Sequence, residues 1–128
     1  MKKLIILFAL VLLASCDEPL FGLKEEGKIS LENGEGEKKS IPYTIYDFVE
    51  YKKMFSYSDF ESMVIKSSVE AKYMCKYKST YEPKSISLSL SNDTTTVGVY
   101  LSAKNAYGVS DNFYVFSIFK GTVFIESY

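Results

Sequence analysis

The two cysteines, Cys16 and Cys75, carry the most reactive side chains of this 128-residue chain, which contains no histidine. A cysteine nucleophile is usually activated by an imidazole base. The chain also has no Cys-x-x-Cys, no Gly-x-Ser-x-Gly and no glycine-rich phosphate loop. Two carboxylates such as Asp47 and Glu61 could in principle serve a glycosidase, but so small a domain rarely forms the cleft. We therefore predict a protein that is not an enzyme and holds no cofactor and no metal.

Residues 2–16 have the layout of an export signal. Two lysines precede an unbroken apolar run, residues 4–14, which ends at Ser15 and Cys16. The run is too short to cross a bilayer of ~30 Å as a helix, which argues against a retained membrane helix. An ordinary secretory signal with an incidental Cys16 is the other alternative, but Leu13 departs from the small-x-small ending of such signals.

The segment Leu13-Ala14-Ser15-Cys16 resembles the lipobox of bacterial lipoproteins. This resemblance covers the first 16 residues. It implies that the Cys16 thiol receives a diacylglycerol, that residues 1–15 are removed as a signal peptide, and that the new amine is acylated. At ~0.8 kcal/mol per buried methylene, two or more chains anchor a protein firmly. A membrane is thus the expected partner, and the cell envelope the expected location.

The mature chain begins with a tether, residues 16–27, that is charged and interrupted by proline and glycine. Asp17 directly follows Cys16, and in enterobacterial lipoproteins an aspartate there accompanies retention in the inner membrane. In Bacteroides-like bacteria, acidic residues near the cysteine accompany display on the outer surface. The chain is rich in Lys, Ser, Ile and Tyr, as an AT-rich genome would encode. This composition favours the second pattern, and hence the outer membrane over the inner one.

Residues 28–128 are expected to fold as one domain around a hydrophobic core. Without Lys2 and Lys3, 13 basic side chains remain against 16 acidic ones, and the net charge moves from −1 to −3. No basic cluster remains that could neutralise a row of phosphates, so we exclude nucleic acid as a partner. With Cys16 lipidated, Cys75 lacks a disulfide partner. We expect a small buried hydrophobe there, because no histidine can activate it as a nucleophile.

Two short alternating runs in residues 28–42 flank the pair Asn33-Gly34, which favours a β-hairpin. Glu32, Glu35 and Glu37 lie near this turn and could be read as calcium ligands. Their spacing matches no calcium loop, so we expect a solvated turn.

The period changes to that of helices between residues 44 and 71. A first amphipathic segment, with Thr44 and Asp47 suited to its N-terminus, runs to about Phe55. A second helix, residues 59–71, follows a capping box at Ser58-Asp59-Phe60-Glu61. Its expected buried stripe is Phe60, Met63, Val64, Ser67 and Ala71.

From residue 72 onward the period is two, which predicts strands. The expected strands are residues 72–78, 85–91, 94–104, 112–120 and 122–127. In the first of them, Tyr73, Cys75 and Tyr77 would share one face. Short links make neighbouring strands antiparallel. The predicted fold is α+β: one or two N-terminal helices packed on one face of an antiparallel meander sheet of four or five strands, with Ile86, Val97, Val99 and Leu101 facing the helices.

The turn Ala103-Lys104-Asn105-Ala106-Tyr107-Gly108 resembles one written Ala-x-Asn-Ala-aromatic-Gly in small, uncharacterised exported bacterial α+β domains. The overlap covers roughly residues 59–120. It implies the same architecture and no particular activity. Asn105 and Gly108 are suited to turn geometry, and Tyr107 is expected to pack beside the hairpin.

The strand 112–120 is apolar on both faces. If Phe113, Val115 and Phe119 face the helices, the outer face receives the side chains Tyr100, Tyr114, Phe116 and Ile118. Two readings stay open. Either another segment, such as residues 28–42, covers this patch, or it is exposed and binds a partner.

These observations predict a lipid-anchored cell-envelope protein that acts as a non-catalytic binding or accessory module. It would hold a protein or an envelope polymer through the outer sheet face. The alternative function is a protective lipoprotein, an immunity protein or inhibitor, that neutralises a toxin or hydrolase.

Overall fold

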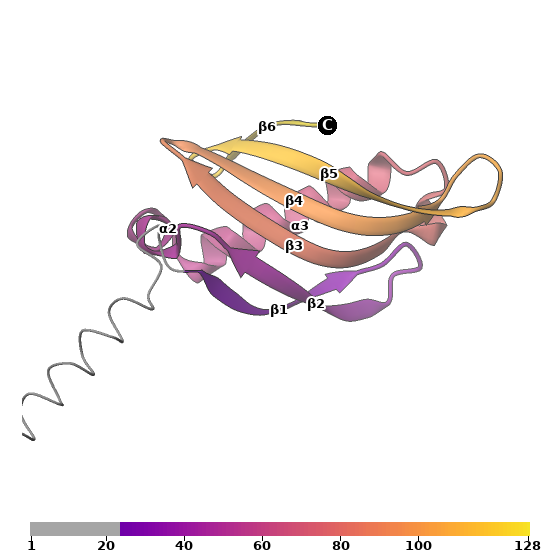
Figure 1. The fold of residues 1–128 in the computed structure, drawn as a ribbon, viewed down its shortest axis with the longest axis horizontal. Coiled ribbons are helices and arrows are strands. Elements are labelled where there is room, and N and C mark those ends of the chain that lie inside the picture. Colours follow the sequence, from indigo (N-terminus) through magenta and orange to yellow (C-terminus); the bar gives the residue numbers. More distant parts are fainter. Residues whose placement is uncertain (1–23) are drawn as a thin grey trace, which may run out of the picture.

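The computed structural model describes residues 24–128, in which six strands and two α-helices form a two-layer α+β domain (Figure 1). Cys16, the predicted signal peptide and most of the predicted tether lie outside the described residues. The elements in chain order are β1 (Glu25–Glu32), β2 (Lys38–Ile45), α2 (Phe48–Met54), α3 (Tyr57–Tyr73), the 3₁₀ turn η1 (Lys78–Thr80), β3 (Glu82–Ser91), β4 (Thr94–Lys104), β5 (Ser110–Lys120) and β6 (Val123–Ser127).

The six strands form one sheet in the order β1-β2-β3-β4-β5-β6. All neighbours pair antiparallel except β2 and β3, which are parallel. A parallel pair needs a crossover connection, and here α2 and α3 supply it. The predicted α+β class is confirmed. The expected strand count and pure meander were wrong, because the hairpin before the helices joins the sheet edge.

Two turns at the same end of the sheet use the same chemistry. Asn33 begins the β1–β2 turn, where its Oδ1 accepts hydrogen bonds from the backbone N–H of Glu35 (3.0 Å) and Glu37 (2.9 Å). Asn105 does the same between β4 and β5, accepting from Tyr107 (2.9 Å) and Val109 (3.1 Å). The fourth residue of each turn is a glycine, Gly36 with φ 82° and Gly108 with φ 76°. The expected hairpin at Asn33-Gly34 is confirmed, but the positive φ lies at the second glycine.

The two helices fall close to their predicted positions but begin differently. Thr44 lies in β2, and Asp47 precedes α2 in a left-handed conformation without a side-chain cap. The capping box of α3 uses Ser56 and Asp59, two residues before the expected one. Both Ser56 and Ser58 have an acid three residues on, so local spacing could not choose between them. The predicted buried stripe of α3 is confirmed.

The predicted strand 72–78 was wrong, because α3 continues to Tyr73. Cys75 lies one turn beyond Ala71, and its Sγ is 3.3 Å from the Ala71 carbonyl oxygen. Helical spacing, not alternation, therefore buries Cys75, while Tyr73 and Tyr77 are exposed. Burial raises the pKa of the Cys75 thiol, although Lys78 acts in the opposite direction. The thiol is thus packed as a buried hydrophobe would be, and its raised pKa disfavours the reactive thiolate form.

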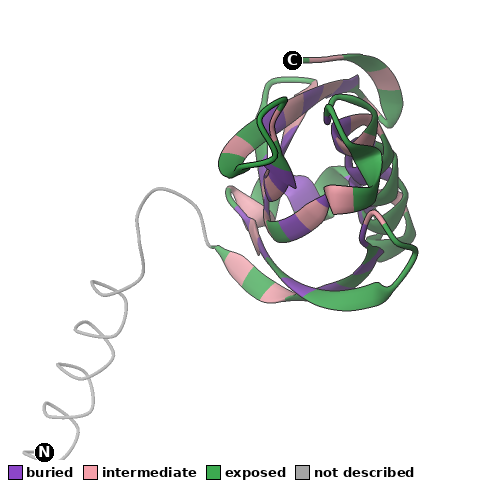
Figure 2. Ribbon diagram, turned by 90° about the vertical axis from the view of Figure 1, so that its right-hand side faces the viewer, coloured by how far each residue is buried: buried purple, intermediate pink, exposed green. Residues whose placement is uncertain are grey.

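The core lies between α3 and the concave face of the sheet (Figure 2). The side chains predicted to face the helices are all buried, and so are three others of the sheet, Leu88, Val115 and Phe119. The predicted ones are Ile86, Val97, Val99 and Leu101. Among residues 24–128, no helix has the length and apolar character needed to cross a membrane.

Tyr81 provides a test of this packing. Its ring is buried, and its hydroxyl lies 2.7 Å from Ser68 Oγ of α3. Burial raises the pKa of Tyr81 to about 12, against the lowering effect of the Ser68 hydrogen bond. The pKa of Tyr81 in the folded protein exceeds its value near 10 in the unfolded chain. The contribution of the neutral, buried Tyr81 to the stability of the fold is therefore complete below pH 10 and is lost as the pH rises towards 12.

We expect alkaline pH to lower the free energy of unfolding by about 2–3 kcal/mol through Tyr81. Denaturant unfolding at pH 9 and pH 12 measures the change, and Tyr81→Phe is the control. The variant should lose less stability over this range. Identical pH dependence of the two proteins would contradict the assignment.

Candidate binding surface

An aromatic row crosses the sheet on the face opposite α3. We call Tyr100, Tyr114, Phe116 and Tyr128 the aromatic face. Tyr100 of β4 lies directly across from Tyr114 of β5. Phe116 is two residues further along β5, and Tyr128 exchanges both backbone hydrogen bonds with it (2.8 and 2.9 Å). Because side chains alternate along a strand, all four rings emerge on the same side.

The rings of the aromatic face touch in sequence. The ring centroids are 4.7 Å apart for Tyr100 and Tyr114, 5.6 Å for Tyr114 and Phe116, and 5.8 Å for Phe116 and Tyr128. The planes of Tyr114 and Phe116 differ by only 7°. These distances lie within the range in which aromatic pairs attract each other. The row is thus a continuous, ordered surface rather than four independent side chains.

Gly98 explains why the Phe116 ring can pack close to the backbone of the sheet. Gly98 is directly opposite Phe116 in the β4–β5 pair. A Cβ at this position would lie 2.6 Å from Ser87 Oγ and 3.0 Å from the Phe116 ring. The missing side chain therefore makes room for the ring, which covers the backbone of β4. Phe116 is partly buried in this way, while Tyr114 remains 53% exposed.

Tyr128 is a member of the surface that the sequence analysis missed. A tight turn joins β5 and β6, and Lys120 pairs with Val123. Further from the turn, an irregularity between Ile118 and Phe119 shifts the register by one residue, so that Ser127 pairs with Ser117. Without this bulge Ser127, not Tyr128, would lie opposite Phe116. The period of two in β6 gives no sign of such a shift, because one bulged residue inverts the faces beyond it.

The structure unites three of the four predicted surface residues. Tyr100, Tyr114 and Phe116 are in contact, whereas Ile118 lies at the end of the row, opposite Thr96 and Glu126, and makes none of these ring contacts. The suggestion that residues 28–42 cover the patch was wrong. These residues form most of the β1–β2 hairpin, which pairs with β3 through Tyr43–Ile45 and extends the sheet.

The β3 side of the row is polar and uncharged, whereas Glu126 lies beside Tyr128 on the same face at the other side. Ser85 and Ser87 of β3 are paired with Tyr100 and Gly98 of β4, and their side chains emerge on the same face. Aromatic faces and hydroxyl groups together suit a partner that offers flat apolar patches and hydrogen-bonding groups. Within residues 24–128, no group of three or more His, Cys, Asp or Glu side chains is placed to hold a metal ion.

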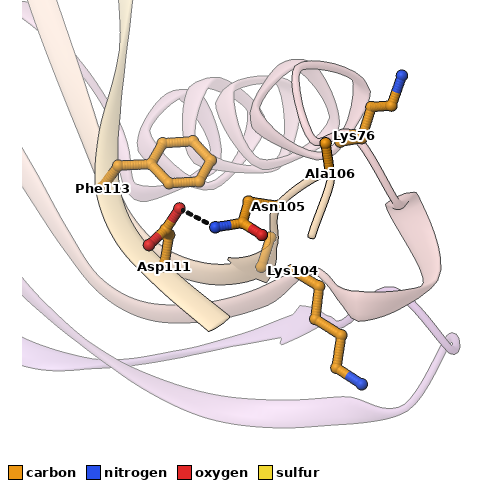
Figure 3. A pocket seen from close by; sticks show the side chains of 7 residues that line it. Lys76, Lys104, Asn105, Ala106, Asp111 and Phe113 are labelled. Atoms are coloured by element: carbon orange, nitrogen blue, oxygen red, sulfur yellow. Dashed lines mark hydrogen bonds between the residues drawn. The ribbon is translucent and has the colours of Figure 1, made fainter. Parts of the chain in front are cut away.

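A shallow pocket lies at the β4–β5 turn, and the polar side chains Asn105 and Asp111 that line it hold the turn in place (Figure 3). Asn105 Nδ2 donates a hydrogen bond of 2.9 Å to Asp111 Oδ2, which ties the turn to β5. Asn105 and Gly108 thus have the predicted turn roles. The expected packing of Tyr107 was wrong, because this side chain is 91% exposed at the tip of the turn.

The carboxylates considered in the sequence do not form a site. Asp47 begins α2, and Glu61 is on the exposed side of α3. Glu35 and Glu37 are exposed in the β1–β2 turn, as expected for a solvated loop.

The surface must be interpreted from its own geometry, since comparison with family models, with curated proteins and with solved structures gave no match to this chain.

Proposed function

We propose that this protein is a lipid-anchored component of the bacterial cell envelope, favouring the outer membrane, that acts by binding through its aromatic face. The observation that carries the proposal is the continuous row of Tyr100, Tyr114, Phe116 and Tyr128 on the sheet face that α3 leaves uncovered. Tyrosine and phenylalanine concentrate binding energy at interfaces, because each buries a large area with few rotatable bonds.

The partner is a protein or an envelope polymer with apolar patches and hydroxyl or amide groups. The row itself carries no charge, and its tyrosine hydroxyls can donate and accept hydrogen bonds. The lipid on Cys16 would hold the domain at the membrane, which raises the effective concentration for any partner in the same envelope.

Photo-crosslinking at position 114 tests the proposal directly. The full-length protein carries a benzophenone side chain in place of Tyr114 and is irradiated in its own cells. Tyr73 is the matched control, because it is an equally accessible tyrosine, 65% exposed against 53%, at the end of α3. We expect a defined adduct from position 114 and none from position 73. Adducts from both positions, or from neither, would contradict the proposal.

The substitution Tyr114→Ser should reduce recovery of the identified partner about tenfold, which is a typical loss at an aromatic contact. Folding should be retained, since this ring is half exposed. The protective alternative predicts a different outcome: the adduct at position 114 would form only with a foreign toxin or hydrolase. An endogenous adduct therefore supports the accessory role.

A further inference from the structure

Among the described residues no strand pairs with the outer side of β1, and its protection against pairing consists of charged side chains such as Lys28 and Glu32. Its eight residues contain no proline, and its pairing with β2 contains no bulge. The opposite edge strand β6 has five residues and an irregular register. Short and bulged edges resist pairing with another chain, whereas a long regular edge invites it.

The register of the hairpin shows which backbone groups of β1 are free. The backbone N–H of Asn33 donates to the Glu37 carbonyl (2.9 Å), which closes the ladder. From there, hydrogen-bonded residue pairs alternate with non-hydrogen-bonded pairs along the antiparallel ladder. The backbone N–H and C=O groups of odd-numbered residues such as Ile29 and Leu31 therefore bond to β2. The N–H and C=O groups of Lys28, Ser30 and Glu32 therefore point away from the sheet and can bond to another strand.

These three edge residues are complementary to a second copy of themselves. In an antiparallel pair centred on Ser30, each Lys28 lies opposite Glu32 of the second copy, and the two Ser30 side chains face each other. The same register sets Ile29 opposite Leu31 on the core side. Both opposite charges and apolar pairs stabilise directly opposed positions.

A second self-complementary stripe lies on α3, beside this edge. Glu61, Ile65, Val69 and Lys72 line a groove of about 430 Å³ together with Ser30 and its neighbours in β1. Ile65 and Val69 are 45% and 42% exposed although they are apolar. Two such helices side by side and antiparallel would place Glu61 opposite Lys72 and Ile65 opposite Val69. Both stripes line the same groove.

We infer that two copies of this chain associate through β1 around a two-fold axis at Ser30, which joins the two sheets into one. The axis is perpendicular to the sheet, so both α3 helices lie on the same side and their Ile65 and Val69 side chains pack together. The contact is isologous and closes on itself, so it gives a dimer and not a fibre. It covers the free edge and the exposed apolar stripe.

Disulfide trapping tests the axis in the full-length protein in membranes. The variant Ser30→Cys places two thiols directly opposite each other, within the Cα separation that a disulfide requires. The matched control is Ser40→Cys, since Ser40 pairs with Ser30, is also exposed, and lies one strand in from the edge. With mild oxidant, we expect a crosslinked dimer from Ser30→Cys only. Equal crosslinking of the two variants, or none, would overturn the inference.

Charge reversal gives an independent test. In the Ser30→Cys background, Lys28→Glu places two glutamates at each end of the contact, and crosslinking should fall about tenfold. Adding Glu32→Lys restores opposite charges across the axis and should restore crosslinking. A peptide partner at this edge would not require this reciprocal pattern. If the double reversal fails to recover the dimer while circular dichroism shows a folded protein, the proposed register is wrong.

Discussion

Replacing Cys16 with serine should abolish incorporation of fatty acid into the protein. A thioether-linked diacylglycerol requires the thiol, and a hydroxyl does not replace it. Each acyl chain would bury roughly ten or more methylenes, so at ~0.8 kcal/mol per methylene the anchor would contribute on the order of 10 kcal/mol per chain. No other single side chain of this protein should matter as much for its location. Metabolic labelling with an alkyne fatty acid, followed by immunoprecipitation, measures the effect.

The natural control for this experiment is Cys75→Ser. Cys75 is buried against α3, so this variant should incorporate as much label as the protein with its original sequence. A second form, with residues 1–16 replaced by an ordinary cleavable signal, should appear in the soluble envelope fraction. Lipid anchoring would be refuted by label that persists in Cys16→Ser, or by recovery of the protein with its original sequence in the soluble fraction.

Replacing Phe60 with alanine should destabilise the domain by about 3–5 kcal/mol, which approaches the total stability of many domains of this size. Phe60 is 1% exposed and lies where α2, α3 and β2 meet. Its ring centroid is 4.7 Å from that of Tyr43 and 6.3 Å from that of Tyr51. Truncation would leave a cavity that these rings cannot close without moving the helices away from the sheet.

The control for Phe60→Ala is Tyr57→Ala, which removes a neighbouring ring of the same helix. Tyr57 is 59% exposed, although its ring centroid is only 5.8 Å from that of Phe60. We expect this change to cost less than about 1 kcal/mol. Urea unfolding followed by far-ultraviolet circular dichroism gives both values. Similar losses from the two variants would show that Phe60 is not part of the structural centre.

The strands β3 and β4 could be predicted from sequence because each has one buried face and one solvent-exposed, mainly polar face. Along β4, Val97, Val99 and Leu101 alternate with polar or small residues, and all three are buried. The same rule failed at Tyr73-Met74-Cys75, where a short alternation coincides with the end of a helix. Alternation over so few residues cannot be distinguished from helical spacing without knowing where the chain packs.

The candidate binding surface was only partly predictable for a similar reason. The two apolar faces of β5 already indicated that Tyr114 and Phe116 needed either a cover or a partner. The role of Gly98 depends on its register opposite Phe116, and the inclusion of Tyr128 depends on the bulge between β5 and β6. Register and bulges arise from pairing between strands, so no single strand contains them.

The sequence by itself determined the α+β class, the buried face of α3 and the strongly alternating strands, because local periodicity alone decides which side of an element is apolar. It also supplied the expectation of a lipid at Cys16, from the order of residues 2–16. Only the tertiary structure decided that β2 lies parallel to β3 and that β1, among the described residues, is an edge strand beside the exposed stripe of α3. These features depend on contacts between residues far apart in the chain, whose free energy exceeds any local preference.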